Sequence, residues 1–342
     1  MLLNSLKNHQ VRPYFWRSRR ESLGAVEFHY LDLGVLRDAV AEEKVTDEAL
    51  EELLYGTSVE RRYTGWTREV LLFVATQCGF SIESGADTAS PSGDGPGPWV
   101  PRNLRLESAP WGPAQILAAR AHLGEQRLWA WRKSLRLSTV SAKARLKAAL
   151  RPADLSGQGL RLNLGAGDEN HVGYIKVDRA GCQHVYDDIV TLTRIRDGSV
   201  AEIYTNHVLE HVPEPLLTPM LTRWREVLAP GGRVLARMPD ARQAVLSLGA
   251  PWVEATAEEL TRHGLPDFLA KEATREGVLD DQAAIQLIYG WSGSTPFSWD
   301  DVNQHKTLWT PALARKRFEA AGFTVEYAEN LGTLNTLVVA QA

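Results

Sequence analysis

Residues 160–178 read LRLNLGAGDENHVGYIKVD, and this stretch decides the fold. Leucine at 160, 162 and 164 alternates with other side chains, which predicts a strand that runs into Gly165, Ala166 and Gly167. A second apolar set at 174, 175 and 177 predicts another strand, ending on Asp178. Small residues after a strand let backbone N–H groups approach a ligand, and a carboxylate at the next strand tip can accept both hydroxyls of a ribose. The stretch therefore predicts a nucleoside-cofactor site.

The spacing within this stretch argues against two phosphate-binding motifs. The dinucleotide fingerprint has a third glycine and an acidic residue about 20 positions further on, whereas Asn170 stands at the third glycine position and Asp178 follows Gly167 by eleven residues. Too little chain remains for a full helix aimed at a pyrophosphate. No Gly-Lys-Ser/Thr follows, which excludes a P-loop. A cofactor without phosphates fits better, so S-adenosylmethionine is predicted and a nicotinamide-dependent oxidoreductase is disfavoured.

The rest of the chain carries further motifs in a fixed order. They are LNLGAG (162–167), GYIKVD (173–178), DI (188–189), DGSVAEIYTNHVLEHV (197–212), REVLAPGGRVLARMPD (225–240), YG (289–290), HKTLWT (305–310) and AAGFTVE (320–326). Together they resemble a branch of the class I S-adenosylmethionine-dependent methyltransferases over about 180 residues. The resemblance implies an α/β fold with a Rossmann-like sheet, mostly parallel and seven-stranded, with an antiparallel C-terminal hairpin.

The same resemblance implies which residues surround the cofactor. Residues 165–167 would line it, Asp178 would hold the ribose, and Asp188 would lie near the adenine. Asn206 and His207 would border the methionine end. The full set of expected cofactor contacts is Asn163, Gly165, Ala166, Gly167, Asp178, Arg179, Asp188, Ile189, Asn206 and His207.

Methyl transfer from a sulfonium is an in-line displacement, so the protein mainly positions the acceptor and can remove a proton. Candidate bases are His207 directly after the fourth strand, His211 one helical turn on, Asp240 at the end of the fifth strand and His305, which matches a family position. Each also has a structural alternative, because a histidine at a helix start is often a cap or core donor. Glu210 with its flanking histidines mimics a metal pair, but no third ligand stands at a suggestive spacing, so no metal is predicted.

Of the components of the reaction, the methyl acceptor is the one that the sequence defines least. No Asp/Asn-Pro-Pro-Tyr follows the fourth strand, where Asn206 and His207 stand instead, and this favours a hydroxyl or carboxyl acceptor. Relatives of this branch are linked with cell-surface polysaccharide and natural-product pathways. The resemblance therefore implies O-methylation of a sugar or another hydroxyl or carboxyl group on a small molecule or glycan. The alternative is a methyltransferase-fold binding or scaffolding subunit without catalysis of its own.

Length, composition and charge limit the classes of protein to which the chain can belong. With 342 residues, 44% of them hydrophobic and 23% charged, the chain is globular and long enough for two domains. A net charge of −4 gives no general case for nucleic-acid binding. Two cysteines, Cys78 and Cys182, are typical of reduced thiols, and no signal peptide or long apolar run is found. A cytoplasmic protein is expected, with membrane contact disfavoured and a homodimer left open.

We predict an N-terminal α+β accessory domain at 1–85, a linker and basic helical connector at 86–157, and the methyltransferase domain at 158–342. Residues 84–101 are rich in Gly, Ser, Pro and Asp, which is typical of a linker. The pattern at 102–151 predicts helices carrying eleven Lys or Arg against two Glu. Such a segment could attract an anionic partner, but a solvated helical connector is the favoured interpretation. Residues 241–300 show no strand signal and are expected as helices and loops.

A comparison of the chain with itself indicates how the accessory domain arose. Residues 65–83 align without a gap on 308–326, so that Trp66 falls on Trp309, Thr67 on Thr310 and Gly79-Phe80 on Gly322-Phe323. Upstream, Trp16, Gly24 and Asp32 fall on Trp224, Gly232 and Asp240 with one common offset, and Tyr55-Gly56 matches Tyr289-Gly290. We therefore hypothesise that the segment is a degenerate copy of the C-terminal half of the methyltransferase domain. Chance similarity of two helix–turn–strand units is the alternative.

Overall fold

The computed structural model describes residues 25–30, 33–55, 80–89, 102–108, 142, 146, 150, 153–167, 169–179, 184–248, 251–253, 276–278, 287–290, 305–330 and 334–342. The chain divides into two compact units. The N-terminal unit comprises Met1–Lys133 and Leu279–Gln304, and the C-terminal unit comprises Ser134–Val278 and His305–Ala342. Cys78, Cys182, Trp291 and Trp299 lie outside the described residues.

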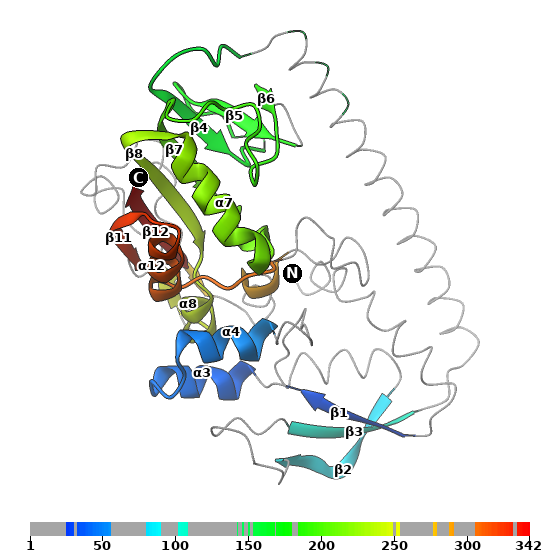
Figure 1. Cartoon of the computed structure of the whole chain (residues 1–342). Helices are drawn as coiled ribbons and strands as arrows, with labels where there is room; N and C mark the ends of the chain where they lie inside the picture. The colour runs from blue at the N-terminus through cyan, green and yellow to red at the C-terminus, as the bar shows by residue number, and fades with distance from the viewer. Residues whose placement is uncertain are drawn as a thin grey trace. The chain divides into compact units, whose positions relative to one another are not determined.

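A seven-stranded sheet forms the frame of the C-terminal unit (Figure 1). Its strands are β4 (Leu160–Leu164), β5 (Ile175–Asp178), β6 (Val185–Tyr186), β7 (Val200–Asn206), β8 (Leu228–Pro239), β11 (Thr324–Asn330) and β12 (Asn335–Gln341). They lie in the order β11-β12-β8-β7-β4-β5-β6. β4 to β8 run parallel, and β12 and β11 are antiparallel to their neighbours. This order is the Rossmann-like sheet of class I methyltransferases, which confirms the predicted fold class.

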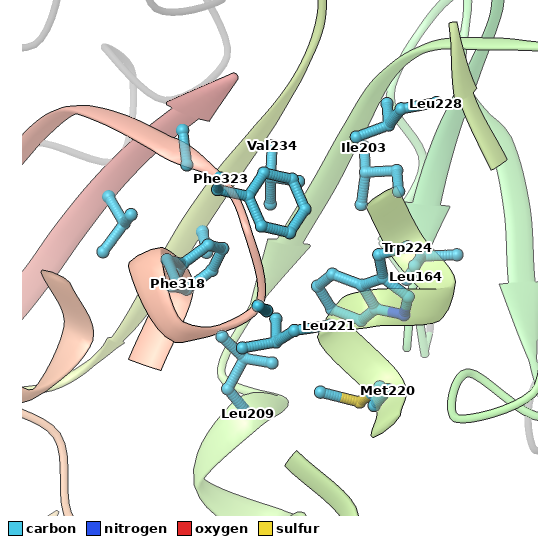
Figure 2. Close-up of a cluster of buried hydrophobic side chains, with 14 of the residues drawn as sticks. Leu164, Ile203, Leu209, Met220, Leu221, Trp224, Leu228, Val234, Phe318 and Phe323 are labelled. Carbon is cyan, nitrogen blue, oxygen red and sulfur yellow. The ribbon is translucent and has the colours of Figure 1, made fainter. Parts of the chain in front are cut away.

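Two helices, α7 (Glu214–Val227) and α12 (Pro311–Ala320), pack on the sheet. The buried residues of α7 recur at helical spacing, and they are Leu217, Met220, Leu221, Trp224 and Val227. Phe318 and Phe323 fill the α12 side of the same core, while Trp224 and Leu221 fill the α7 side (Figure 2). The Trp224 indole N–H donates to the Ile189 carbonyl at 2.7 Å, so its one polar atom is satisfied.

The turn before the fifth strand takes a form that the sequence pattern did not predict. β8 begins at Leu228, directly after α7, and the Pro-Gly-Gly residues lie inside it as an irregularity. Val200 pairs with Leu228 but Glu202 pairs with Arg233, so extra residues of β8 are accommodated opposite β7. The expected absence of strands in residues 241–300 is wrong, because β9 (Pro251–Val253) and β10 (Glu276–Val278) form a short antiparallel ribbon.

The N-terminal unit contains a three-stranded antiparallel sheet in the order β1-β3-β2. Its elements are β1 (Ala25–Tyr30), α3 (Leu33–Ala41), α4 (Asp47–Tyr55), β2 (Phe80–Ala89) and β3 (Arg102–Ser108). The prediction of helix from residue 102 onward is therefore wrong for β3, where Leu104 and Leu106 alternate with the polar residues Asn103, Arg105 and Glu107 in a strand pattern. Residues 84–89, expected in the linker, belong to β2.

Each described helix is too short or too polar to cross a membrane.

Candidate functional site

The sheet brings the ends of three strands together at one edge. Leu164, the last residue of β4, pairs with Val177 of β5 and with Thr205 of β7. The Thr205 hydroxyl donates to the Leu164 carbonyl at 3.2 Å. Ligands of open α/β folds bind outside the carboxyl ends of such strands, so the residues that follow β4, β5 and β7 define the candidate site.

The turn after β4 requires glycine. Gly165 and Gly167 have φ angles of +67° and +47°, a region that residues with a Cβ rarely adopt. A Cβ added at Gly165 would lie 2.4 Å from Val208 Cγ2, so the turn packs closely against the chain that follows β7. A Cβ added at Gly167 would meet nothing within 4 Å. The turn is thus fixed at its first glycine and leaves open space beside its second.

Asp178, at the end of β5, is tied to this turn. Its Oδ2 accepts a hydrogen bond from the Gly167 N–H at 2.7 Å, and the Gly165 N–H donates to the Val177 carbonyl at 2.9 Å. An ionised carboxylate has about four acceptor positions, so it can accept hydrogen bonds from a backbone N–H and from hydroxyl donors. The glycine turn and the carboxylate expected to hold a ribose therefore lie in direct contact.

The expected adenine-side residues form a second group. Arg179 Nη1 lies 2.8 Å from Asp188 Oδ2 in an exposed ion pair. The carbonyl of Ile189 accepts the hydrogen bond from Trp224, which anchors the loop to the core. Asp187, which the motifs did not single out, is buried and accepts hydrogen bonds from its own loop. Asp187 therefore shapes the loop, and Asp188 lies nearer to solvent.

Glu169 is a site residue that the motifs missed. Its Oε1 accepts a hydrogen bond from Asn206 Nδ2 at 3.0 Å, and its Oε2 lies 3.1 Å from His171 Nε2. The buried Asn206 Oδ1 and Asn163 Nδ2 have no hydrogen-bond partner among the described residues. Unpaired buried polar atoms are costly, so both suit a polar ligand atom. The only signal for Glu169 in the sequence is its place two residues after the glycine turn.

Three of the four expected bases gather around one buried carboxylate, that of Glu210. Its Oε1 lies 3.2 Å from His207 Nδ1 and 3.9 Å from both His211 Nε2 and His305 Nε2. Burial alone would raise the pKa of Glu210, but the adjacent His207, together with His211 and His305, outweighs burial and lowers that pKa to about 2. Glu210 is therefore ionised at neutral pH, although its side chain is only 2% exposed.

Backbone contacts far apart in the sequence assemble this cluster. Glu210 lies in η1 (Leu209–His211), a single 3-10 turn after β7. The N–H groups of Lys306 and Thr307 both donate to the Glu210 carbonyl, and the Thr307 hydroxyl lies within hydrogen-bond distance of the Leu209 carbonyl. The HKTLWT segment thereby places His305 against η1. His207 itself has a φ of +52°, a left-handed conformation that is strained for a residue with a Cβ.

Asp240, the fourth expected base, has a structural role. It is the N-cap of α8 (Ala241–Leu246), where its Oδ1 accepts from the Gln243 N–H at 2.9 Å. Its Oδ2 accepts from Asn330 Nδ2 at 2.9 Å and from the Thr336 hydroxyl at 3.0 Å. These bonds join α8 to β11 and β12. The structure thus shows Asp240 as a helix cap that bridges to two strands, and its expected role as a base stays a prediction.

Comparisons with known proteins give the following. No protein-family model matches the chain, and no curated protein matches it in sequence. An S-adenosylmethionine-dependent methyltransferase from Mesorhizobium loti is 13% identical, with 57% of this chain and 95% of that chain covered and a TM-score of 0.32. The 1,6-didemethyltoxoflavin-N1-methyltransferase of Burkholderia thailandensis, solved with S-adenosylhomocysteine, is 14% identical, with 68% and 92% covered and a TM-score of 0.34. The fold class rests on the strand order of the sheet itself.

Proposed function

We propose that this protein is an S-adenosylmethionine-dependent methyltransferase that methylates a hydroxyl or carboxyl oxygen, with a sugar hydroxyl as the favoured acceptor. The observation that carries the proposal is the hydrogen bond between the Gly167 N–H and the Asp178 carboxylate at the carboxyl edge of the sheet. It joins a glycine turn with open space beside it to a carboxylate, a group whose oxygens accept hydrogen bonds from hydroxyl donors. A nucleoside without phosphates can use both features.

Each polar group then has a defined task. Asp178 would accept the two ribose hydroxyls, and the unpaired amide atoms of Asn163 and Asn206 would meet polar atoms of the cofactor. When bound, S-adenosylmethionine supplies the electrophilic methyl group. His207, directly after β7 and with its side chain 39% exposed, would orient the acceptor oxygen and take up its proton. The buried Glu210 beside it would stabilise the resulting imidazolium.

Calorimetric titration of S-adenosylmethionine and S-adenosylhomocysteine tests the cofactor site. Asp178→Ala should weaken both by at least about 100-fold, because each lost hydrogen bond to a charged acceptor is worth about 1.5–3 kcal/mol. Asp197→Ala is the matched control, since Asp197 is 71% exposed and pairs with Arg223 away from the glycine turn. That variant should bind both ligands as wild type does.

Wild-type protein that binds neither ligand would contradict the proposal. That result would favour the alternative, a methyltransferase-fold binding or scaffolding subunit. If the cofactor binds, release of S-adenosylhomocysteine in the presence of sugar, other hydroxyl and carboxyl acceptors identifies the acceptor class. His207→Ala should then lower the turnover rate much more than it changes the affinity for S-adenosylmethionine, since its task concerns the acceptor proton.

A further inference from the structure

Glu210 presents a problem that hydrogen bonds within the described residues do not solve. Both of its carboxylate oxygens are buried, and neither accepts a hydrogen bond there. Three imidazoles approach Oε1 at 3.2–3.9 Å. An ionised carboxylate removed from water is stable only when it is paired or bound to a metal. Buried oxygens without a donor among the described residues, with imidazole nitrogens close to them, are the kinds of ligand atom that a transition metal binds.

Two imidazole rings lie side by side next to this oxygen. The rings of His211 and His305 lie 4.9 Å apart, centroid to centroid, in an edge-on arrangement. Both Nε2 atoms lie 3.9 Å from the same oxygen. One cation between the three groups would neutralise the carboxylate and use the lone pairs of both rings.

We propose that Glu210, His211 and His305 bind one divalent transition-metal ion, with His207 beside the site as the base. One ligand atom from each of these three residues lies within 4.8 Å of the others. In a tetrahedral site with bonds of about 2.1 Å, ligand atoms are about 3.4 Å apart. Shifts of roughly an ångström or less would therefore close the site. Two imidazoles with one carboxylate favour Zn²⁺ or a similar ion over Mg²⁺ or Ca²⁺, which prefer oxygen ligands.

The ion would lie next to the acceptor hydroxyl that must lose its proton. This step rests on the proposed function, because it assigns the ion to the acceptor side of the methyl group, next to His207. A hydroxyl oxygen of the acceptor would bind at an open coordination position, and its proton would pass to His207. That oxygen would then bond to the methyl carbon as the carbon–sulfur bond of the sulfonium breaks, leaving neutral S-adenosylhomocysteine. The acceptor class is thus a hydroxyl compound that can coordinate a metal, such as a vicinal diol.

Calorimetric titration of Zn²⁺ into chelator-treated full-length protein, without cofactor, tests the site. Wild type should bind one Zn²⁺ per chain with micromolar or tighter affinity. His211→Ala and His305→Ala should each weaken that affinity at least about 100-fold, because one of the few ligands is lost. His184→Ala is the matched control, since His184 is an exposed histidine of the same unit, and it should bind as wild type does.

Cobalt provides a second measurement that does not depend on the histidine-to-alanine variants folding. Co²⁺ bound to wild type should give the visible absorption of a low-coordinate nitrogen–oxygen site, and Glu210→Gln should lose it. Wild type that binds no Zn²⁺, or a folded His305→Ala with unchanged affinity, would overturn the proposal and leave imidazolium as the partner of Glu210. Titration of S-adenosylmethionine into the same samples separates this result from a failure of the proposed methyltransferase function.

Discussion

The molecule contains two antiparallel three-strand arrangements with the same plan. In the N-terminal unit the order is β1-β3-β2, and in the C-terminal unit the end of the large sheet has the order β8-β12-β11. In each case the strand that comes last in the sequence lies between the other two, and every pairing is antiparallel. α3 follows β1 in the chain, as α8 follows β8.

The strand pairings allow the two arrangements to be compared residue by residue. The sequence alignment places β1 on β8 through Gly24 and Gly232, and it places β2 on β11 through Phe80 and Phe323. By the first match Ala25 corresponds to Arg233, and their partners are Glu107 and Gln341. By the second match Ser81 corresponds to Thr324, and their partners are again Glu107 and Gln341. Two independent alignments thus place β3 on β12 with one common register.

The difference between the two arrangements lies at the edge strand. β8 pairs on its other side with β7, and the parallel strands that carry the glycine turn follow. β1 is an edge strand among the described strands of its sheet. The comparison therefore separates an antiparallel frame from a parallel half that holds the candidate chemistry. It supports the hypothesis of a degenerate half-copy, which would bind no cofactor and would instead pack, dimerise or shape the acceptor site.

The largest expected effect comes from the glycine turn after β4, which the described strands of the N-terminal sheet do not reproduce. Gly165→Ala adds a Cβ 2.4 Å from Val208 Cγ2 at a φ of +67°. Strain at positive φ and overpacking together should lower the free energy of unfolding by about 3 kcal/mol. S-adenosylmethionine affinity should fall at least about 30-fold because the turn is displaced, equivalent to about 2 kcal/mol. Chemical denaturation and calorimetric titration measure the two effects.

Two control variants separate the overpacking at Gly165 from strain at positive φ and from a general loss of stability. Gly159→Ala has a similar φ of +70° with nothing within 4 Å of the added Cβ, so it should cost only about 1 kcal/mol and leave binding unchanged. Leu50→Ala in α4 removes a fully buried side chain of the N-terminal unit and should cost about 2–5 kcal/mol, again without changing cofactor affinity. Loss of affinity in Leu50→Ala would show that the two units are coupled and would weaken the separation.

A smaller effect is expected from a row of ion pairs across the parallel strands β4, β7 and β8, called the ion row below. Glu202 of β7 accepts hydrogen bonds from Arg161 of β4 at 2.6 Å and from Arg233 of β8 at 2.7 Å. The residue that corresponds to Arg233 in β1 is Ala25, so the copy lacks this row. Glu202→Gln should lower the free energy of unfolding by only about 1–2 kcal/mol, because the two guanidinium groups are 40% and 37% exposed.

The pH dependence of that loss has a defined sign. Burial raises the pKa of Glu202, but hydrogen bonds from Tyr174, Arg161 and Arg233 outweigh burial and hold it below the usual 4.5. A depressed pKa stabilises the fold above the unfolded-state value and loses this contribution as the pH falls through the folded-state value. The gap between wild type and Glu202→Gln should therefore be complete at pH 7 and shrink below about pH 4.5. A gap that stays constant down to pH 3 would contradict the ion row.

The sequence was sufficient for elements whose signals are local. The apolar alternation before Gly165 predicted a strand where the structure has β4. β3 was missed because its two leucines lie among polar and charged residues in a basic stretch, which resembles a solvated helix. Pairing with β1 and β2 decides its conformation, and that information is not local.

The same limit applied to the candidate site. The position of Asp178 beside the glycine turn could be predicted, because both follow adjacent strands. The position of Glu210 could not, because its burial depends on the segment at 305–310, nearly a hundred residues further on. The hydrogen bonds of Asp240 with Asn330 and Thr336 of distant strands could not be predicted from its strand-end position either. Burial and partner choice are tertiary properties.

The smallest expected effect gives the sharpest test of the half-copy. Thr310 is the N-cap of α12, where its hydroxyl oxygen accepts from the Leu313 N–H at 3.3 Å. Thr310→Ala should therefore lower stability by about 1 kcal/mol. The alignment places Thr67 on Thr310, so the hypothesis predicts a similar loss for Thr67→Ala. Hydrogen exchange should show the first loss in peptides of α12 and β11, and the second in residues 67–79 and β2.

Thr46 provides the matched control within the N-terminal unit. Its hydroxyl oxygen accepts from the Ala49 N–H at 3.2 Å before α4, so Thr46→Ala should cost about 1 kcal/mol whatever the origin of the segment. If Thr46→Ala destabilises the unit but Thr67→Ala does not, the unit folds without the cap that the alignment requires. The common register of β3 and β12 would then reflect the shared geometry of three antiparallel strands. A loss at both positions would extend the correspondence to residues 67–79 and favour common origin.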